Sequence, residues 1–195
     1  MSEPAPPRRP PDLRSLAADL EEVSRATARL CTGLSDDQLT WRTNLESWSI
    51  AHCFEHLRIA DTLYAWRVRP VIERARARGK RRGAEEPIAK SWIGRRMIAA
   101  MRPGSAYRAR APKVFRPEDK PPPKSWRHFL AGQATTAGLL RDAEGLPLNR
   151  LHVGSPITKL LRLRLGESLV LLVVHQQRHL LQAERVREDP HFPTW

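Results

Sequence analysis

Long hydrophobic runs are absent from this sequence of 195 residues. No window approaches the roughly 18 consecutive apolar residues that a membrane-spanning helix requires, and the N-terminus lacks the apolar segment of a secretory signal. Cysteine is also scarce, since only Cys31 and Cys53 are present, too few for a framework of several disulfide bonds. These absences exclude membrane spanning and secretion and indicate a cytoplasmic protein.

Several motifs of nucleotide and acyl chemistry are missing as well. The chain has no P-loop, no glycine-rich dinucleotide fingerprint and no Gly-x-Ser-x-Gly elbow. Nucleotide-driven and serine-hydrolase reactions are therefore not expected. Apolar residues make up 41% of the chain and charged residues 28%, a balance typical of a folded globular domain.

Acidic residues are few relative to basic ones. The chain has 21 Asp and Glu against 34 Lys and Arg, a net charge of +13, and the basic segment 67–82 contributes +7 of it. A solvated helix end that runs into a basic loop explains such a segment. A surface that binds nucleic acid or an acidic partner is the alternative, although no aromatic residue for base stacking stands among the arginines.

Apolar periodicity predicts four substantial helices. Five prolines within residues 1–12 indicate an extended tail. Beyond it, apolar residues recur at steps of three and four, as on one face of a helix. The four segments with this pattern are 13–30, 49–78, 125–140 and 166–187. Pro70 is expected to interrupt or bend the second of them.

The second and third predicted helices are joined by a long, proline-rich crossover, 79–124. It contains one short amphipathic piece, 92–101, and is expected to be irregular elsewhere. Leu161, Leu163 and Leu165 alternate with arginines and predict a brief extended segment. We therefore expect an all-α protein, a four-helix bundle over 13–189 with an irregular insertion and a C-terminal tail at 190–195.

Two histidine pairs point to metal chemistry. His175 and His179 are four residues apart and project from one face of the last helix, and His52 and His56 repeat this spacing on the second helix. One imidazole from the second helix would complete a set of three nitrogen ligands and leave positions open for water or substrate. Cys53 is either a fourth ligand, a nucleophile or, as is more common, a buried structural thiol.

Two segments resemble the DinB/YfiT-like superfamily. Residues 48–51 (WSIA) with 55–57 (EHL) are similar to its second-helix signature, and residues 175–186 (HQQRHLLQAERV) are similar to its last-helix signature, with 165–169 as the usual lead-in. The resemblance implies a four-helix bundle that holds a divalent metal with His56, His175 and His179. His52 matches a variable position, so we expect it to support a ligand or to be merely exposed.

The resemblance also sets the range of activities. Characterised relatives include thiol-dependent S-transferases and a mycothiol-dependent maleylpyruvate isomerase, and others are described as metal-dependent hydrolases. It thus implies a transferase or hydrolase in which zinc, nickel, iron or manganese activates a low-molecular-weight thiol or water for a small-molecule substrate. Gln182 is expected to orient a ligand imidazole or bound water. No residue is nominated as general acid or base.

The resemblance leaves the partners of the chain open. Many relatives form homodimers, and the apolar stripe at 92–101 would suit such an interface. No membrane partner is expected. The competing hypothesis is a non-catalytic helical module that binds an acidic partner or nucleic acid through the segment 67–82.

Overall fold

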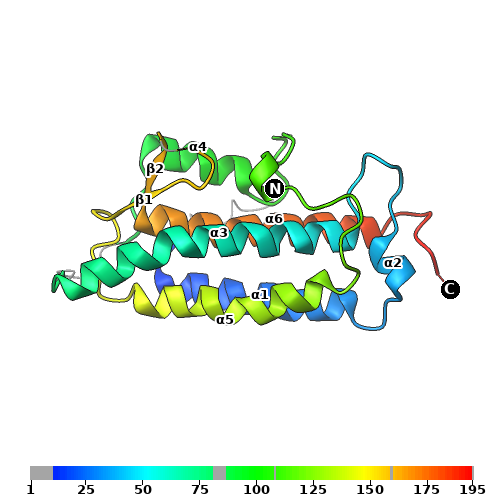
Figure 1. Ribbon diagram of the computed structural model, residues 1–195, viewed down its shortest axis with the longest axis horizontal. Coiled ribbons are helices and arrows are strands. Elements are labelled where there is room, and N and C mark those ends of the chain that lie inside the picture. The colour runs from blue at the N-terminus through cyan, green and yellow to red at the C-terminus, as the bar shows by residue number, and fades with distance from the viewer. Residues whose placement is uncertain (1–10, 81–86, 108, 159, 195) are drawn as a thin grey trace, which may run out of the picture.

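The computed structural model describes residues 11–80, 87–107, 109–158 and 160–194. Four long helices lie side by side along the longest axis (Figure 1). They are α1 (Leu13–Cys31), α3 (Ile50–Ala77), α5 (Ser125–Asp142) and α6 (Leu165–Arg187). The all-α fold predicted from the sequence is confirmed. Most of the proline-rich segment 1–12, namely residues 1–10, lies outside the described residues.

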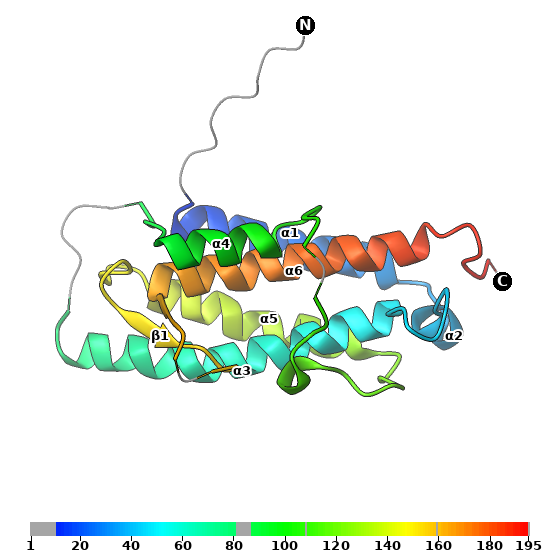
Figure 2. The same ribbon diagram turned by 90° about the horizontal axis from the view of Figure 1, so that it is seen from above.

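The four helices form two layers, with α3 and α6 in one and α1 and α5 in the other (Figures 1 and 2). A fifth helix, α4 (Trp92–Met101), packs on α6 from outside the bundle. The short elements are α2 (Asp36–Thr40), the 3-10 turn η1 (Lys113–Phe115) and the strands β1 (His152–Gly154) and β2 (Arg162–Arg164). The two strands pair antiparallel, with Val153 opposite Leu163.

Side-chain capping sets where three helices begin. Asp12, Ser35 and Ser49 each accept a hydrogen bond from the backbone N–H three residues later, and the side chain at that later position accepts one in return. This reciprocal arrangement satisfies two N–H groups that the first turn leaves without a helical partner. The predicted start at Ser49 is thus where α3 begins. Pro70 does not end α3, which continues to Ala77.

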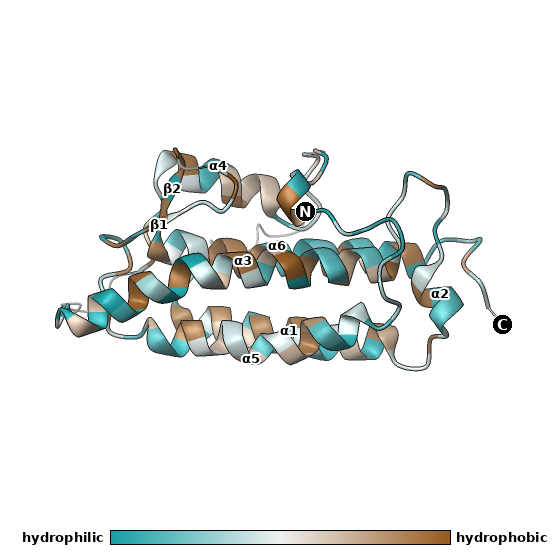
Figure 3. Ribbon diagram, viewed as in Figure 1, coloured by the Kyte–Doolittle hydropathy of each residue, from teal (hydrophilic) through white to brown (hydrophobic). Residues whose placement is uncertain are grey.

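Hydrophobic and hydrophilic residues alternate along the long helices (Figure 3). The buried apolar residues form two clusters, one at each half of the bundle. Leu20, Val68 and Leu169 belong to the larger cluster, and Phe54 and Phe129 pack in the smaller one with their rings tilted and the ring centroids 5.4 Å apart. None of the described helices is long and apolar enough to cross a membrane.

The crossover between α3 and α5 is fastened to α6. The Glu167 carboxylate accepts hydrogen bonds from the backbone N–H groups of Ser91 and Arg164, which joins the start of α4 to the start of α6. Further along, the guanidinium of Arg178 donates to the carbonyls of Ala100 and Tyr107 at 3.0 and 2.7 Å. The described part of the crossover that includes α4 therefore lies against α6 on the outside of the bundle.

Candidate metal centre

Three histidines from two helices meet inside the bundle. His56 comes from α3, and His175 and His179 come from α6, one turn apart. One ring nitrogen from each lies within 4.8 Å of the other two, and the Nε2 atoms of His56 and His175 are 3.1 Å apart. Among the described residues this is the one group of three or more His, Cys, Asp or Glu side chains close enough to share an ion.

Hydrogen bonds fix the tautomers of two of these imidazoles. His56 Nδ1 lies 2.7 Å from the carbonyl oxygen of Phe115, and His179 Nδ1 lies 2.9 Å from the amide oxygen of Gln182. Both oxygens only accept hydrogen bonds, so each Nδ1 carries the proton. The lone pair of each neutral ring is consequently on Nε2, where a metal would bind.

The spacing of the nitrogens suits a first-row metal ion. Two imidazole nitrogens bound tetrahedrally at about 2.0–2.1 Å from zinc lie about 3.3 Å apart. The His56–His175 separation of 3.1 Å is close to that value. The His179 ring lies close to both, with its centroid 4.5 Å from that of His56 and 4.7 Å from that of His175.

The histidine site has the electrostatic character that neutral ligands require. Burial lowers the pKa of His56 to about 4, against a weaker upward effect of its bond to Phe115. Burial, followed by the neighbouring His56, lowers the pKa of His179 to about 3. The pKa of His175 is also well below its ordinary value, chiefly through burial and then through His179. At neutral pH all three imidazoles are therefore uncharged and able to bind a cation.

An indole covers one side of the cluster. The Trp48 ring lies 4.9 Å from the His56 ring and 5.6 Å from the His179 ring, measured between centroids. Trp48 directly precedes the Ser49 cap of α3, so the start of this helix fixes its position. The half-buried indole therefore borders the histidines with an apolar surface on that side.

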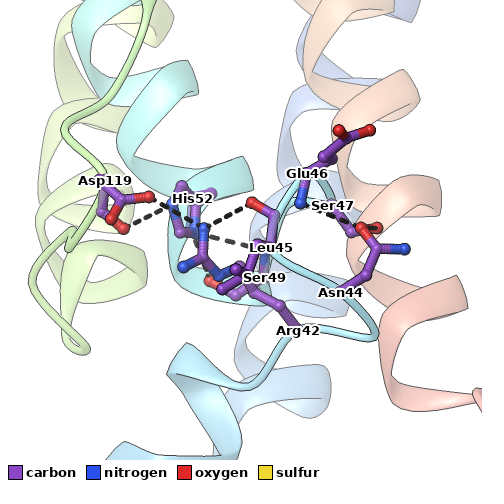
Figure 4. Close-up of polar contacts among 8 residues, drawn as sticks. All are labelled: Arg42, Asn44, Leu45, Glu46, Ser47, Ser49, His52 and Asp119. Carbon is purple, nitrogen blue, oxygen red and sulfur yellow. Dashed lines mark hydrogen bonds and ion pairs between the residues drawn. The ribbon is translucent and has the colours of Figure 1, made fainter.

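His52 does not join the three histidines. It is buried, and its Nδ1 lies 2.7 Å from the hydroxyl oxygen of Ser49 and 3.3 Å from the Ser49 backbone nitrogen. Its Nε2 lies 3.1 Å from the carbonyl oxygen of Asp119 in the crossover (Figure 4). The sequence left two alternatives for His52: it supports a ligand, or it is exposed. The structure shows a buried residue that caps α3 and holds the crossover.

Neither cysteine belongs to the histidine cluster. Cys53 is fully buried in the smaller apolar cluster, and burial raises the pKa of its thiol far above the ordinary value. Burial raises the pKa of Cys31 to about 12. Because the thiolate is the nucleophile and the metal ligand, these environments support the structural interpretation of Cys53.

A row of hydrogen-bonded polar side chains lies beside the site and was not predicted from the sequence. Gln133 of α5 donates to Gln176 of α6 at 3.1 Å, and Gln176 donates to the Asp61 carboxylate of α3 at 2.8 Å. Burial raises the pKa of Asp61 to about 8, despite the opposing hydrogen bond from Gln176. Sequence periodicity does not predict this hydrogen-bonded row, because its three residues come from three helices. Only the adjacency of Gln176 to His175 hinted at it.

The basic segment 67–82 lies on the other half of α3. Its residues up to Lys80 are described, and Arg81 and Arg82 lie outside the described residues. The structure does not bring it to the histidines.

The family model of the DinB superfamily matches residues 19–183, which span most of the bundle and all three clustered histidines. No curated protein and no solved structure matches the chain.

Proposed function

The chain belongs to the DinB superfamily, and from this premise we propose that it binds one divalent metal ion through His56, His175 and His179 as a metal-dependent transferase or hydrolase. The metals that suit three imidazoles are zinc, nickel, iron and manganese. The substrate that we propose is a small molecule, with a low-molecular-weight thiol or water as the nucleophile.

One observation carries the metal site. The protons of His56 and His179 are held on Nδ1 by Phe115 and Gln182, and so both rings carry their lone pairs on Nε2. A neutral imidazole that is oriented through its other nitrogen is the usual form of a metal-bound histidine. Ordinary packing does not require two neighbouring histidines to be oriented in this way beside a third.

The residues of the chain define what the site offers to a reaction. Three neutral ligands leave the full positive charge of a divalent ion uncompensated, and such an ion lowers the pKa of a coordinated thiol or water toward neutrality. Trp48 contributes apolar surface beside His56, and a less polar surrounding strengthens electrostatic interactions. Phe115 and Gln182 keep two imidazoles in a single orientation, so little reorganisation is needed.

Elemental analysis of the untagged full chain tests the metal site. We expect about one divalent ion per chain in the wild type and loss of that ion in His56→Ala and His179→Ala. His52→Ala is the matched control, because it removes a buried imidazole one turn away on the same helix and should keep the metal. Wild-type protein without metal after reconstitution under reducing conditions, or full metal content in both ligand variants, would overturn the proposal.

The choice between a thiol and water needs a second experiment. Metal-loaded protein is assayed with electrophilic small molecules, with and without added low-molecular-weight thiols. Turnover that depends on a thiol identifies a transferase, and turnover without one identifies a hydrolase. Metal binding with no turnover in either assay would support a non-catalytic module and contradict the enzymatic part of the proposal.

A further inference from the structure

A strongly basic hollow lies between the C-terminal half of α3 and the β1–β2 ribbon. Its volume is about 270 Å³. The charged and titratable side chains that line it are all basic: Arg74, Arg78, Lys80, Arg150, His152 and Arg162. Only the first three belong to the basic segment 67–82, so the fold adds basic side chains from a distant part of the chain.

The backbone explains why these side chains converge. Arg74 lies in the last turn of α3, and Arg78 is the residue that caps the C-terminus of this helix. On the ribbon, Gly154 pairs with Arg162 and His152 pairs with Arg164, which makes His152 and Arg162 diagonal neighbours on one face. Val153 and Leu163 point to the other face and are buried, so His152 and Arg162 are directed outward.

The charges of this hollow are not neutralised by the part of the chain that the structure describes. Within that part, none of its Arg or Lys side chains forms an ion pair with a carboxylate. Basic residues are common at a helix C-terminus, where they interact favourably with the helix dipole. That effect accounts for Arg74 and Arg78, but it does not account for Arg150 or Arg162, which come from a loop and a strand.

We propose that this hollow binds a small ligand with several negative charges on phosphoryl oxygens, such as a di- or triphosphate group. Arginine guanidinium groups bind such oxygens through paired, charge-assisted hydrogen bonds. The volume lies just below the roughly 300–1,000 Å³ of typical small-molecule sites, which favours a compact anion over a folded partner. This inference does not depend on the metal site.

Calorimetric titration of the full chain with sodium tripolyphosphate, at about 150 mM salt, tests the proposal. We expect one ligand per chain. The double variant Arg78→Ala/Arg150→Ala should bind at least about tenfold more weakly, because it loses two guanidinium groups that donate charge-assisted hydrogen bonds to the ligand. The matched control is Arg67→Ala/Arg69→Ala, which removes the same amount of charge from the basic segment 67–82 outside the hollow and should change affinity less than about twofold.

Further measurements separate binding in the hollow from binding at the metal site and from nucleic-acid binding. Because tripolyphosphate also chelates metals, the titration is repeated with His175→Ala, which should bind it as the wild type does. The metal content of Arg78→Ala/Arg150→Ala should be unchanged, which keeps this test distinct from that of the metal site. Absence of tripolyphosphate binding, or equal weakening in both double variants, would overturn the proposal. Tighter binding of a single-stranded oligonucleotide that both double variants weaken equally would instead indicate an extended nucleic-acid surface.

Discussion

His52 and His56 lie one turn apart on α3 and are held in opposite tautomers. His52 donates from Nε2 to the Asp119 carbonyl, whereas His56 donates from Nδ1 to the Phe115 carbonyl. The proton of His52 therefore occupies the nitrogen that a metal would need, and the proton of His56 does not. This difference separates the candidate ligand from its neighbour within one i, i+4 pair.

Gln182 should affect metal affinity without binding the metal. Its amide oxygen accepts the Nδ1 hydrogen of His179 at 2.9 Å, and so Gln182→Leu removes the group that fixes the ligand tautomer. Loss of such a partner typically weakens metal binding about 10- to 100-fold. Competition titration with a chromophoric chelator measures the change. Gln177→Leu, on the same helix but outside the site, is the control, and equal affinities in the two variants would contradict this role.

Cys53 should be dispensable for any activity and inert in the native protein. Its side chain is fully buried, and burial raises its thiol pKa far above neutrality, so almost no thiolate is present at pH 7. We expect alkylation by iodoacetamide only after denaturation, and full metal content in Cys53→Ala. Mass spectrometry of the native and the denatured protein checks the first expectation. Rapid native labelling at Cys53 would show that this thiol is reactive.

Alanine substitutions at two glycines should change the stability of the fold in opposite directions. A Cβ atom on Gly94 of α4 would overlap the Glu167 carboxylate, whereas one on Gly132 of α5 meets no atom within 4 Å. Gly94→Ala should therefore destabilise the fold by about 1–3 kcal/mol through crowding. Gly132→Ala should stabilise it by about 0.5–1 kcal/mol through helix propensity. Urea denaturation measures both, and the same sign for the two variants would refute the packing of α4 on α6.

Asp61 should make stability depend on pH. Burial raises its pKa from 3.8 to about 8 in the folded state, so the folded chain binds the proton more tightly than the unfolded chain. Its stabilising contribution is thus complete below about pH 4 and is lost as the pH rises toward 8, by up to a few kcal/mol.

The variant Asp61→Asn isolates this effect from that of the buried histidines. Asparagine keeps the shape and an acceptor for Gln176 but does not titrate. The stability of the variant relative to the wild type should therefore increase from pH 5 to pH 8. Denaturation curves at several pH values provide the measurement, and a constant difference between the two proteins would show that Asp61 does not titrate in this range.

The sequence predicted the helices well because local signals agree with the packing. Ser35 and Ser49 start their helices by capping, and the apolar spacing defines the buried faces. The shared face of His175 and His179 could be predicted because residues four apart on one helix point in the same direction. Metal binding by the cluster stays a prediction, although the structure brings the three imidazoles together.

The partners of these histidines could not be predicted in the same way. Phe115 contributes a backbone carbonyl, which carries no side-chain signature, from a crossover without regular periodicity. The hydrogen bond from Gln176 to Asp61 joins two helices whose relative register depends on the whole core. The convergence of Arg150 and Arg162 on α3 depends on the strand pairing in the same way.

The length of α3 determines how the two proposed sites relate. His56 lies near its start and Arg74 near its end, and 18 residues of helix separate them by about 27 Å. That distance is about three Debye lengths at physiological salt, so charge at one site is almost fully screened from the other. One small molecule cannot occupy both. The effects of substitutions at the two sites should therefore add. Loss or alteration of one site should leave binding at the other unchanged.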